Sequence, residues 1–147
     1  MPRKIALYAF ALTLLGGSVA TVADALVLTD EEQLDALVED LTSSRVGHRV
    51  DAVLDFAAPS REPVEVVADG EADSFADGDE VELAGRTRAL LADLETDDLD
   101  VVQHTVDIEG ERARIVVRVR TADGYLNAQL RLHRHEDRWL IESLRVT

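Results

Sequence analysis

The sequence predicts an α+β domain in which three helices cover one face of an antiparallel sheet. Three helical patterns come first, at residues 29–41, 45–58 and 79–95. Four runs of alternating apolar and polar residues then close the chain, at residues 99–108, 112–121, 125–134 and 138–146. Because alternation leaves one face of the resulting β-meander apolar, the helices are expected to pack against that face.

The first helix is predicted to begin at the capping box Thr29-Asp30-Glu31-Glu32. In this motif the hydroxyl of Thr29 accepts a hydrogen bond from the amide of Glu32, and the carboxylate of Glu32 reaches back to Thr29. An apolar stripe with helical spacing follows, formed by Leu34, Leu37, Val38 and Leu41.

The second helix is expected over residues 45–58, where Pro59 and Pro63 end it. The third is expected to start at Asp79, which can cap it, and to run to about Glu95. Between these two helices, Pro63–Ala68 is predicted as a short strand at an edge of the sheet.

The segment that follows this strand is rich in acidic and turn residues, and we expect a loop or a broken second strand pinned by Phe75. Its acids also fall at positions 1, 3, 5 and 12 of a twelve-residue calcium loop, namely Asp69, Glu71, Asp73 and Glu80. Ser74 replaces the glycine of that loop, and a strand stands where the entering helix belongs. We therefore favour an acidic loop that collects cations loosely over a specific calcium site.

The turns of the meander are explicit in the sequence. Asp123-Gly124 predicts a two-residue hairpin of type I′, and Glu109–Glu111 and His135–Asp137 predict the other two bends. Alternation then assigns one group of residues to the face beneath the helices: Ile115, Val117, Val119, Leu126, Ala128, Leu130 and Leu132.

This order of elements, closed by Arg138-Trp139-Leu140-Ile141, resembles the nuclear transport factor 2-like (NTF2-like) superfamily, which includes the ketosteroid isomerase and SnoaL-like groups. The resemblance covers residues 29–147. It implies a curved antiparallel sheet of four to six strands that wraps three helices into a cone, often with a pocket at the open end and a dimer across the sheet. The fold does not determine the activity, because it hosts both enzymes and binding modules.

Residues 1–25 are predicted to be a signal peptide or an N-terminal membrane anchor, and residues 26–147 the folded domain. Arg3 and Lys4 precede an uncharged apolar run, and small-x-small cleavage sites end at Ala20 and at Ala25, of which we prefer the second. We therefore expect export to the periplasm or the extracellular space, or anchoring on the outer side of the cytoplasmic membrane. The chain has no cysteine, which excludes disulfides and thiolate zinc sites.

The formal net charge is −15, and the acids are concentrated in the helical half. Residues 29–100 carry 22 acidic residues and five arginines, whereas residues 101–147 carry seven acidic residues and eight arginines. Such a surface repels nucleic acid and anionic lipid, so we expect neither as a partner, except for membrane contact through the N-terminal segment.

A catalytic hypothesis places His104 in the cone beside Asp51 or Asp55 of the second helix, as in a small-molecule isomerase or dehydratase. The alternative, which we prefer, is a core histidine satisfied by a neighbour. Tyr125 and Trp139 are weak candidates for ligand contacts. Two sets with metal-ligand spacing, His48 with Asp51 and Asp55, and His133 with His135 and Asp137, are better explained as solvated surface, so we expect no metal site and no cofactor.

The polar face of the meander is the largest surface that is not acidic, and it could be a homodimer or protein-partner interface or plain solvated sheet. Its residues are Arg114, Arg118, Arg120, Asn127, Gln129 and Arg131. We expect an exported or membrane-tethered, non-catalytic domain that acts by binding a small ligand or a protein. The alternatives are the enzyme described above and a structural accessory domain of a cell-envelope complex.

Overall fold

The computed structural model describes residues 28–43, 45–92 and 99–147. In it, three helices lie on one face of a six-stranded sheet. The sheet belongs to the compact unit Leu34–Thr147. The predicted leader, residues 1–25, lies outside the described residues and stays a prediction. Among the residues that are described, no helix is both long enough and apolar enough to cross a membrane.

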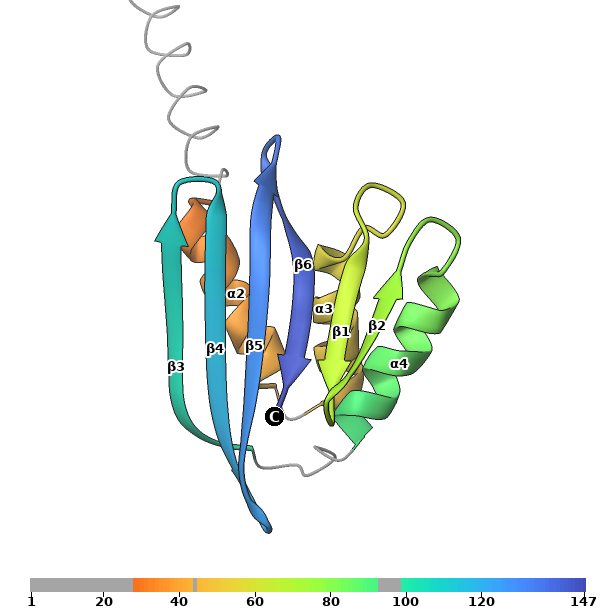
Figure 1. The fold of residues 1–147 in the computed structure, drawn as a ribbon. Helices are drawn as coiled ribbons and strands as arrows, with labels where there is room; N and C mark the ends of the chain where they lie inside the picture. Colours follow the sequence, from red (N-terminus) through yellow and green to blue (C-terminus); the bar gives the residue numbers. More distant parts are fainter. Residues whose placement is uncertain (1–27, 44, 93–98) are drawn as a thin grey trace, which may run out of the picture. The chain divides into compact units, whose positions relative to one another are not determined.

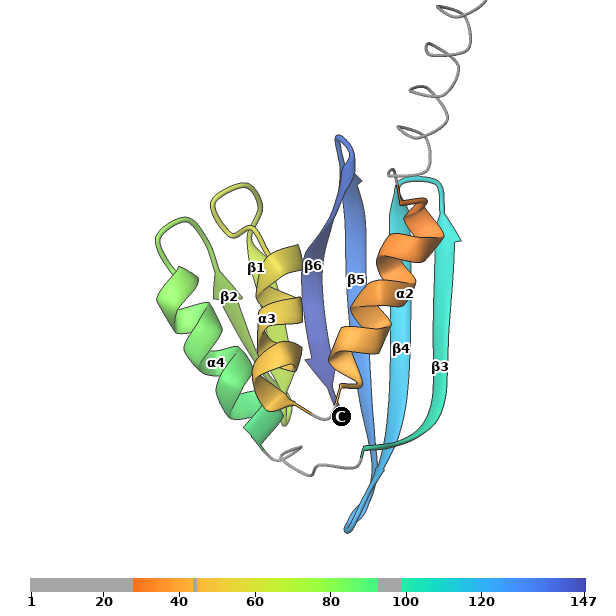
Figure 2. The same ribbon diagram turned by 180° about the vertical axis from the view of Figure 1, so that it is seen from behind.

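The strands lie side by side in the order β2-β1-β6-β5-β4-β3 (Figure 1). Their bounds are β1 (Val64–Ala68), β2 (Glu71–Phe75), β3 (Asp100–Glu109), β4 (Arg112–Thr121), β5 (Gly124–His135) and β6 (Arg138–Val146). The helices α2 (Asp30–Leu41), α3 (Val46–Phe56) and α4 (Glu80–Ala92) all lie on one side of this curved sheet (Figure 2). The predicted fold class, three helices on a curved sheet that ends in a meander, is confirmed.

The core fills the space between the sheet and the helices. The inner face of the sheet is the face that the helices cover. Side chains at alternate positions of β4 and β5 are buried on this face, where they pack against apolar side chains of the helices. The largest fully buried members are Leu34 and Leu37 of α2, Val53 of α3, Leu83 of α4, Ile115 of β4, Leu130 and Leu132 of β5, and Trp139, Ile141 and Leu144 of β6. The predicted assignment of faces is thus confirmed for the meander.

The capping box begins α2 as predicted. The hydroxyl of Thr29 accepts a hydrogen bond from the amide of Glu32 at 3.3 Å, and the amide of Thr29 donates to the Glu32 carboxylate at 2.8 Å. The Thr29 amide, and secondarily its hydroxyl, lower the pKa of Glu32 because both hydrogen bonds favour the charged carboxylate.

One buried side chain was not predicted from the helical pattern, namely Arg49 of α3. Its Nε donates a hydrogen bond to the carbonyl oxygen of Ser43, which ties α3 to the segment that follows α2. Burial lowers the pKa of Arg49, because removing a guanidinium from water disfavours its charge.

The place of β1 in the sheet differs from the prediction. β1 lies between β2 and β6 instead of at an edge, and it runs parallel to β6, so the sheet is mixed and not purely antiparallel. The parallel pairing is possible because α4 and the meander intervene in the chain between these two strands.

The acidic segment after β1 folds as the second strand of a hairpin and ends at the buried Phe75, so of the two expected alternatives, a loop or a second strand, the strand is confirmed. Asp69 and Gly70 form the turn, with φ of 54° and 81°, and Glu71 and Asp73 belong to β2. Asp73 pairs with Arg86 of α4 at 2.9 Å. Acids spread along an extended strand in this way do not converge on one ion.

The turn type at the β4–β5 hairpin was also predicted wrongly. Thr121 pairs with Gly124, so the two loop residues are Ala122 and Asp123, and neither has the positive φ that a type I′ turn requires. The positive φ, 143°, falls on Gly124 instead. The Asp-Gly signal for a type I′ turn applies to Asp69-Gly70, where both residues have positive φ.

The packing of the core predicts that substitutions at two positions of α4 will change the free energy of unfolding by very different amounts. Leu83→Ala removes a side chain that is 1% exposed and should lower the free energy of unfolding by about 2–5 kcal/mol. Val81→Ala, at a position 80% exposed, should change it by less than about 0.5 kcal/mol. Urea unfolding followed by circular dichroism measures both, and equal effects would contradict the placement of α4 on the sheet.

Candidate functional site

The interior of the domain is filled by side chains. The cavity between the sheet and the helices has a volume of about 30 Å³, whereas ligand pockets typically have about 300–1,000 Å³. Apolar residues from every layer line it: Leu41, Val53, Leu91, Leu99, Val117, Val119, Leu126, Ala128, Leu130, Leu144 and Val146. In the described part of the chain, this space admits a water molecule or two and no substrate.

His104 lies on β3 and pairs with Val117, which places it on the helix side of the sheet as predicted. It is exposed, so the preferred interpretation as a core histidine is wrong, and it lines an open groove between α2 and β3 together with Asp35, Glu39 and Thr42. The lining of this groove comes from α2 and β3 and not from α3, where Asp51 and Asp55 are exposed. The structure therefore brings His104 to the carboxylates of α2, not to the two that the sequence suggested.

The other candidate residues from the sequence differ widely in how exposed their side chains are. His48 and Asp51 are exposed on α3. Trp139 is 2% exposed and belongs to the core, whereas Tyr125 is 52% exposed on the opposite face of the sheet. Tyr125 alone of the two weak ligand candidates is thus available to a partner.

The outer face of the sheet, meaning the face without helices, carries an aromatic and cationic patch. The guanidinium of Arg118 lies over the ring of Tyr125 at 4.4 Å from its centroid, and that of Arg120 lies at 5.9 Å. The three residues project from neighbouring positions of β4 and β5. Cation–π contacts of this kind restrict the positions of the arginine side chains.

Hydrogen bonds and ion pairs order the remaining polar residues of this face. Arg114 donates to the side-chain oxygen of Gln129 at 3.2 Å, and Arg131 donates to the hydroxyl of Ser143 at 2.9 Å. Ion pairs join Arg120 to Asp100 at 3.2 Å and Arg131 to Glu65 at 3.9 Å. Both partners in these two pairs are about half exposed, so each pair adds little stability and mainly fixes geometry.

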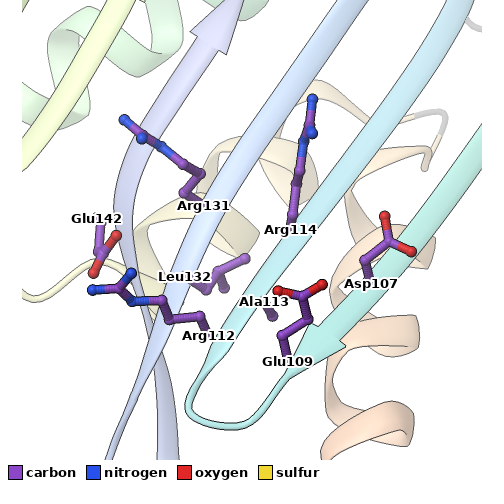
Figure 3. Close-up of a pocket in the computed structure, with 8 residues that line it drawn as sticks. All are labelled: Asp107, Glu109, Arg112, Ala113, Arg114, Arg131, Leu132 and Glu142. Atoms are coloured by element: carbon purple, nitrogen blue, oxygen red, sulfur yellow. The ribbon is translucent and has the colours of Figure 1, made fainter.

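An open concavity of about 610 Å³ lies toward one end of the outer face (Figure 3). It contains charges of both signs, and its lining comprises Asp107, Glu109, Arg112, Ala113, Arg114, Arg131, Leu132 and Glu142. In Figure 3, Asp107 and Glu109 stand on the β3 side, and the arginines extend from β4 and β5. Polar lining and wide opening suit a macromolecular surface or hydrated ions better than an apolar small molecule.

A compact group of titratable side chains lies beside this concavity. Nε2 of His133 is 2.7 Å from a carboxylate oxygen of Glu62, and Nδ1 of the same ring is 3.6 Å from an oxygen of Glu142. The His133 side chain is 19% exposed, and its buried Nδ1 has no hydrogen-bond partner among the described residues. Ligand atoms from the three residues lie within 4.8 Å of one another.

Sequence reasoning grouped His133 with His135 and Asp137 and missed Glu62 and Glu142, which come to the ring from distant parts of the chain. Arg131 pairs with Ser143 and Leu132 with Ile141, so Glu142 is the extra residue in β6. The buried apolar residues on either side give the signal that could have found it. Trp139 and Ile141 are buried at odd-numbered positions, whereas Leu144 and Val146 are buried at even-numbered positions. A strand can bury both pairs on one face only if an extra residue stands between them.

Comparisons with solved structures show the fold. A protein from Shewanella frigidimarina, provisionally named a ketosteroid isomerase, has a TM-score of 0.56 at 14% identity, with 78% of this chain and 94% of that one covered. An NTF2-like protein of unknown function from Silicibacter pomeroyi has a TM-score of 0.51 at 21% identity, covering 82% and 98%. A DUF4783 family protein from Bacteroides fragilis has a TM-score of 0.52 at 17% identity, covering 76% and 92%. No protein-family model and no curated protein matches the sequence.

The filled interior predicts how apolar probes bind. Saturating benzene should leave the melting temperature of the native chain unchanged. Leu130→Ala, which truncates a fully buried wall of the cavity, should lower stability by about 2–5 kcal/mol and create space that benzene can enter. Benzene should then raise the melting temperature of this variant only. Stabilisation of the native chain to a similar extent would show that an apolar pocket exists without the mutation.

Proposed function

We propose, from its NTF2-like fold and its filled interior, that this chain is an exported, non-catalytic binding domain that pairs with a second copy of itself through the outer face of its sheet. The observation that carries the proposal is the cavity of about 30 Å³. An isomerase or dehydratase on this fold needs space between sheet and helices for its substrate, and here apolar side chains occupy that space. We therefore assign binding to the outer surface of the domain.

The patch of Arg118, Arg120 and Tyr125 supports the outer face as the interface. Tyrosine and arginine are enriched among the residues that contribute most to protein–protein affinity. Stacking against the ring restricts the arginine side chains in the unbound chain, so less conformational entropy is lost when a partner binds.

The charge pattern supports a second copy as the partner. The outer face carries arginines in its centre and carboxylates toward both sides, with Glu65 on β1 and Asp107 on β3. Two such faces related by a twofold axis can place the arginines of each copy against the carboxylates of the other. The acidic helices repel one another at the same time, which disfavours association through the opposite layer.

Export rests on the first 25 residues of the sequence. A basic start at Arg3 and Lys4, an apolar run and small residues before Ala25 match the layout of a signal peptide. On this proposal the domain works in the periplasm, outside the cell, or at the outer side of the cytoplasmic membrane.

Pairing through the sheet predicts that charge reversal on the outer face separates the copies. The purified full chain should sediment in analytical ultracentrifugation with the mass of a dimer. Arg118→Glu combined with Arg120→Glu should shift it to the mass of a monomer, because the cation–π contacts are lost and like charges then face each other.

One matched double variant serves as the control for this experiment. Arg88→Glu of α4 with Arg45→Glu, which precedes α3, makes the same charge change at exposed positions of the helix layer, and it should leave the dimer intact. A native chain that is monomeric at high micromolar concentration would refute pairing. Equal loss of the dimer in both double variants would refute the assignment of the interface.

Export predicts a processed chain outside the cytoplasm. In a bacterial host, fractionation followed by mass spectrometry should find a form that begins after Ala25 or after Ala20, or an intact form in the membrane fraction. Arg3→Glu with Lys4→Glu should reduce the exported amount severalfold, because it removes the positive start of the leader. An unprocessed chain confined to the cytoplasm would contradict export.

A further inference from the structure

We propose that Glu62, His133 and Glu142 bind one divalent transition-metal ion of the Zn²⁺ class at the end of the outer face. These three residues come from distant parts of the sequence: the turn before β1, strand β5 and the bulge of β6. The site is separate from the binding patch around Tyr125 and does not depend on the proposed pairing.

The chemistry of the three donors suits this class of metal. Zn²⁺ takes imidazole nitrogen and carboxylate oxygen at about 2.0–2.2 Å, commonly with three protein ligands and one water. Two carboxylates and a neutral imidazole also supply two negative charges, which balance the charge of the ion. Calcium and magnesium prefer sets made of oxygen atoms alone, so the histidine disfavours them.

The distance between Nδ1 of His133 and the nearest Glu142 oxygen points in the same direction. At 3.6 Å it is too long for a hydrogen bond, and the buried nitrogen has no other partner among the described residues. Two atoms bound to the same tetrahedral Zn²⁺ are about 3.3 Å apart, given bond lengths near 2.0–2.1 Å. The two atoms therefore need to approach each other by only a few tenths of an ångström to bind the same ion.

Glu62 lies on the other side of the ring, at 2.7 Å from Nε2. One of its oxygens can rotate toward the ion, or the carboxylate can hold Nε2–H and so fix the ring for coordination through Nδ1. Its backbone is held in place, because its amide donates to the carbonyl of Ala58 at 3.0 Å. Either role makes Glu62 part of the site.

Glu142 follows the inward residue Ile141, so its carboxylate lies on the outer face with His133, where it lines the concavity (Figure 3). It is also the extra residue of the bulge in β6. Bulges that redirect one side chain are frequent at functional sites. The concavity gives water access to the fourth coordination position. Arg112, the cross-strand neighbour of His133, lowers the affinity for a cation, and the two carboxylates outweigh it.

Isothermal titration of the metal-free full chain with zinc chloride tests the proposal. The expected result is one ion per chain with a dissociation constant in the micromolar range or below. Glu142→Gln keeps the shape of the side chain and removes its charge, and it should weaken binding at least tenfold, as should His133→Ala. Circular dichroism shows whether each variant is folded, and a folded Glu142→Gln variant that binds zinc like the native chain would overturn the assignment.

Matched controls separate this site from loose binding to surface residues. His135→Ala and Glu136→Gln alter exposed neighbours in the same hairpin and should leave the affinity unchanged. Equal losses in the controls would overturn the proposal, as would a ratio other than one ion per chain. The absence of any zinc binding would also overturn the proposal, and the three residues would then be only a histidine that contacts two carboxylates. The titration repeated on the Arg118→Glu, Arg120→Glu variant should give the same result, which separates this inference from the proposed pairing.

Discussion

Burial of the inner face of the sheet is the constraint on which the rest of the structure depends. Alternation in β4 and β5 places Ile115, Val117, Leu130 and Leu132 beneath the helices, and side chains of α2, α3 and α4 fill the space above them. A core packed this closely leaves about 30 Å³ between the sheet and the helices of the described residues, far less than a ligand pocket needs. The proposal that recognition takes place on the outside rests on this packing.

The same alternation separates the charges of the two layers. Acids occupy the exposed side of the helices, as in the first turn of α2 with Asp30, Glu31 and Glu32, and arginines occupy the outer face of β4 and β5. This separation supports the proposed pairing through the sheet, because the helix layers of two copies would repel each other. The cation–π contacts at Tyr125 then make the centre of that face more rigid than an ordinary array of exposed arginines.

Local signals predicted the elements well, and non-local pairing could not be predicted from them. The capping box at Thr29, the four strands of the meander and their inward residues follow from spacing within one segment. The parallel pairing of β1 with β6 joins segments about 80 residues apart, and nothing local encodes it. Likewise His104 was assigned to the correct face, but its exposure depends on where α2 crosses the sheet.

The candidate metal site illustrates how core packing can create a surface feature. Trp139 and Ile141 must point inward, and so must Leu144 and Val146, but the two pairs are out of phase by one residue. One extra residue in β6 resolves the conflict, and that residue is Glu142. The bulge that satisfies the core thus leaves two consecutive residues on the outer face: Glu142, near His133, and Ser143, which accepts the hydrogen bond from Arg131. In a regular strand these two consecutive residues would point to opposite faces, so the packing of the core and the arrangement of polar side chains on the outer face depend on the same register shift.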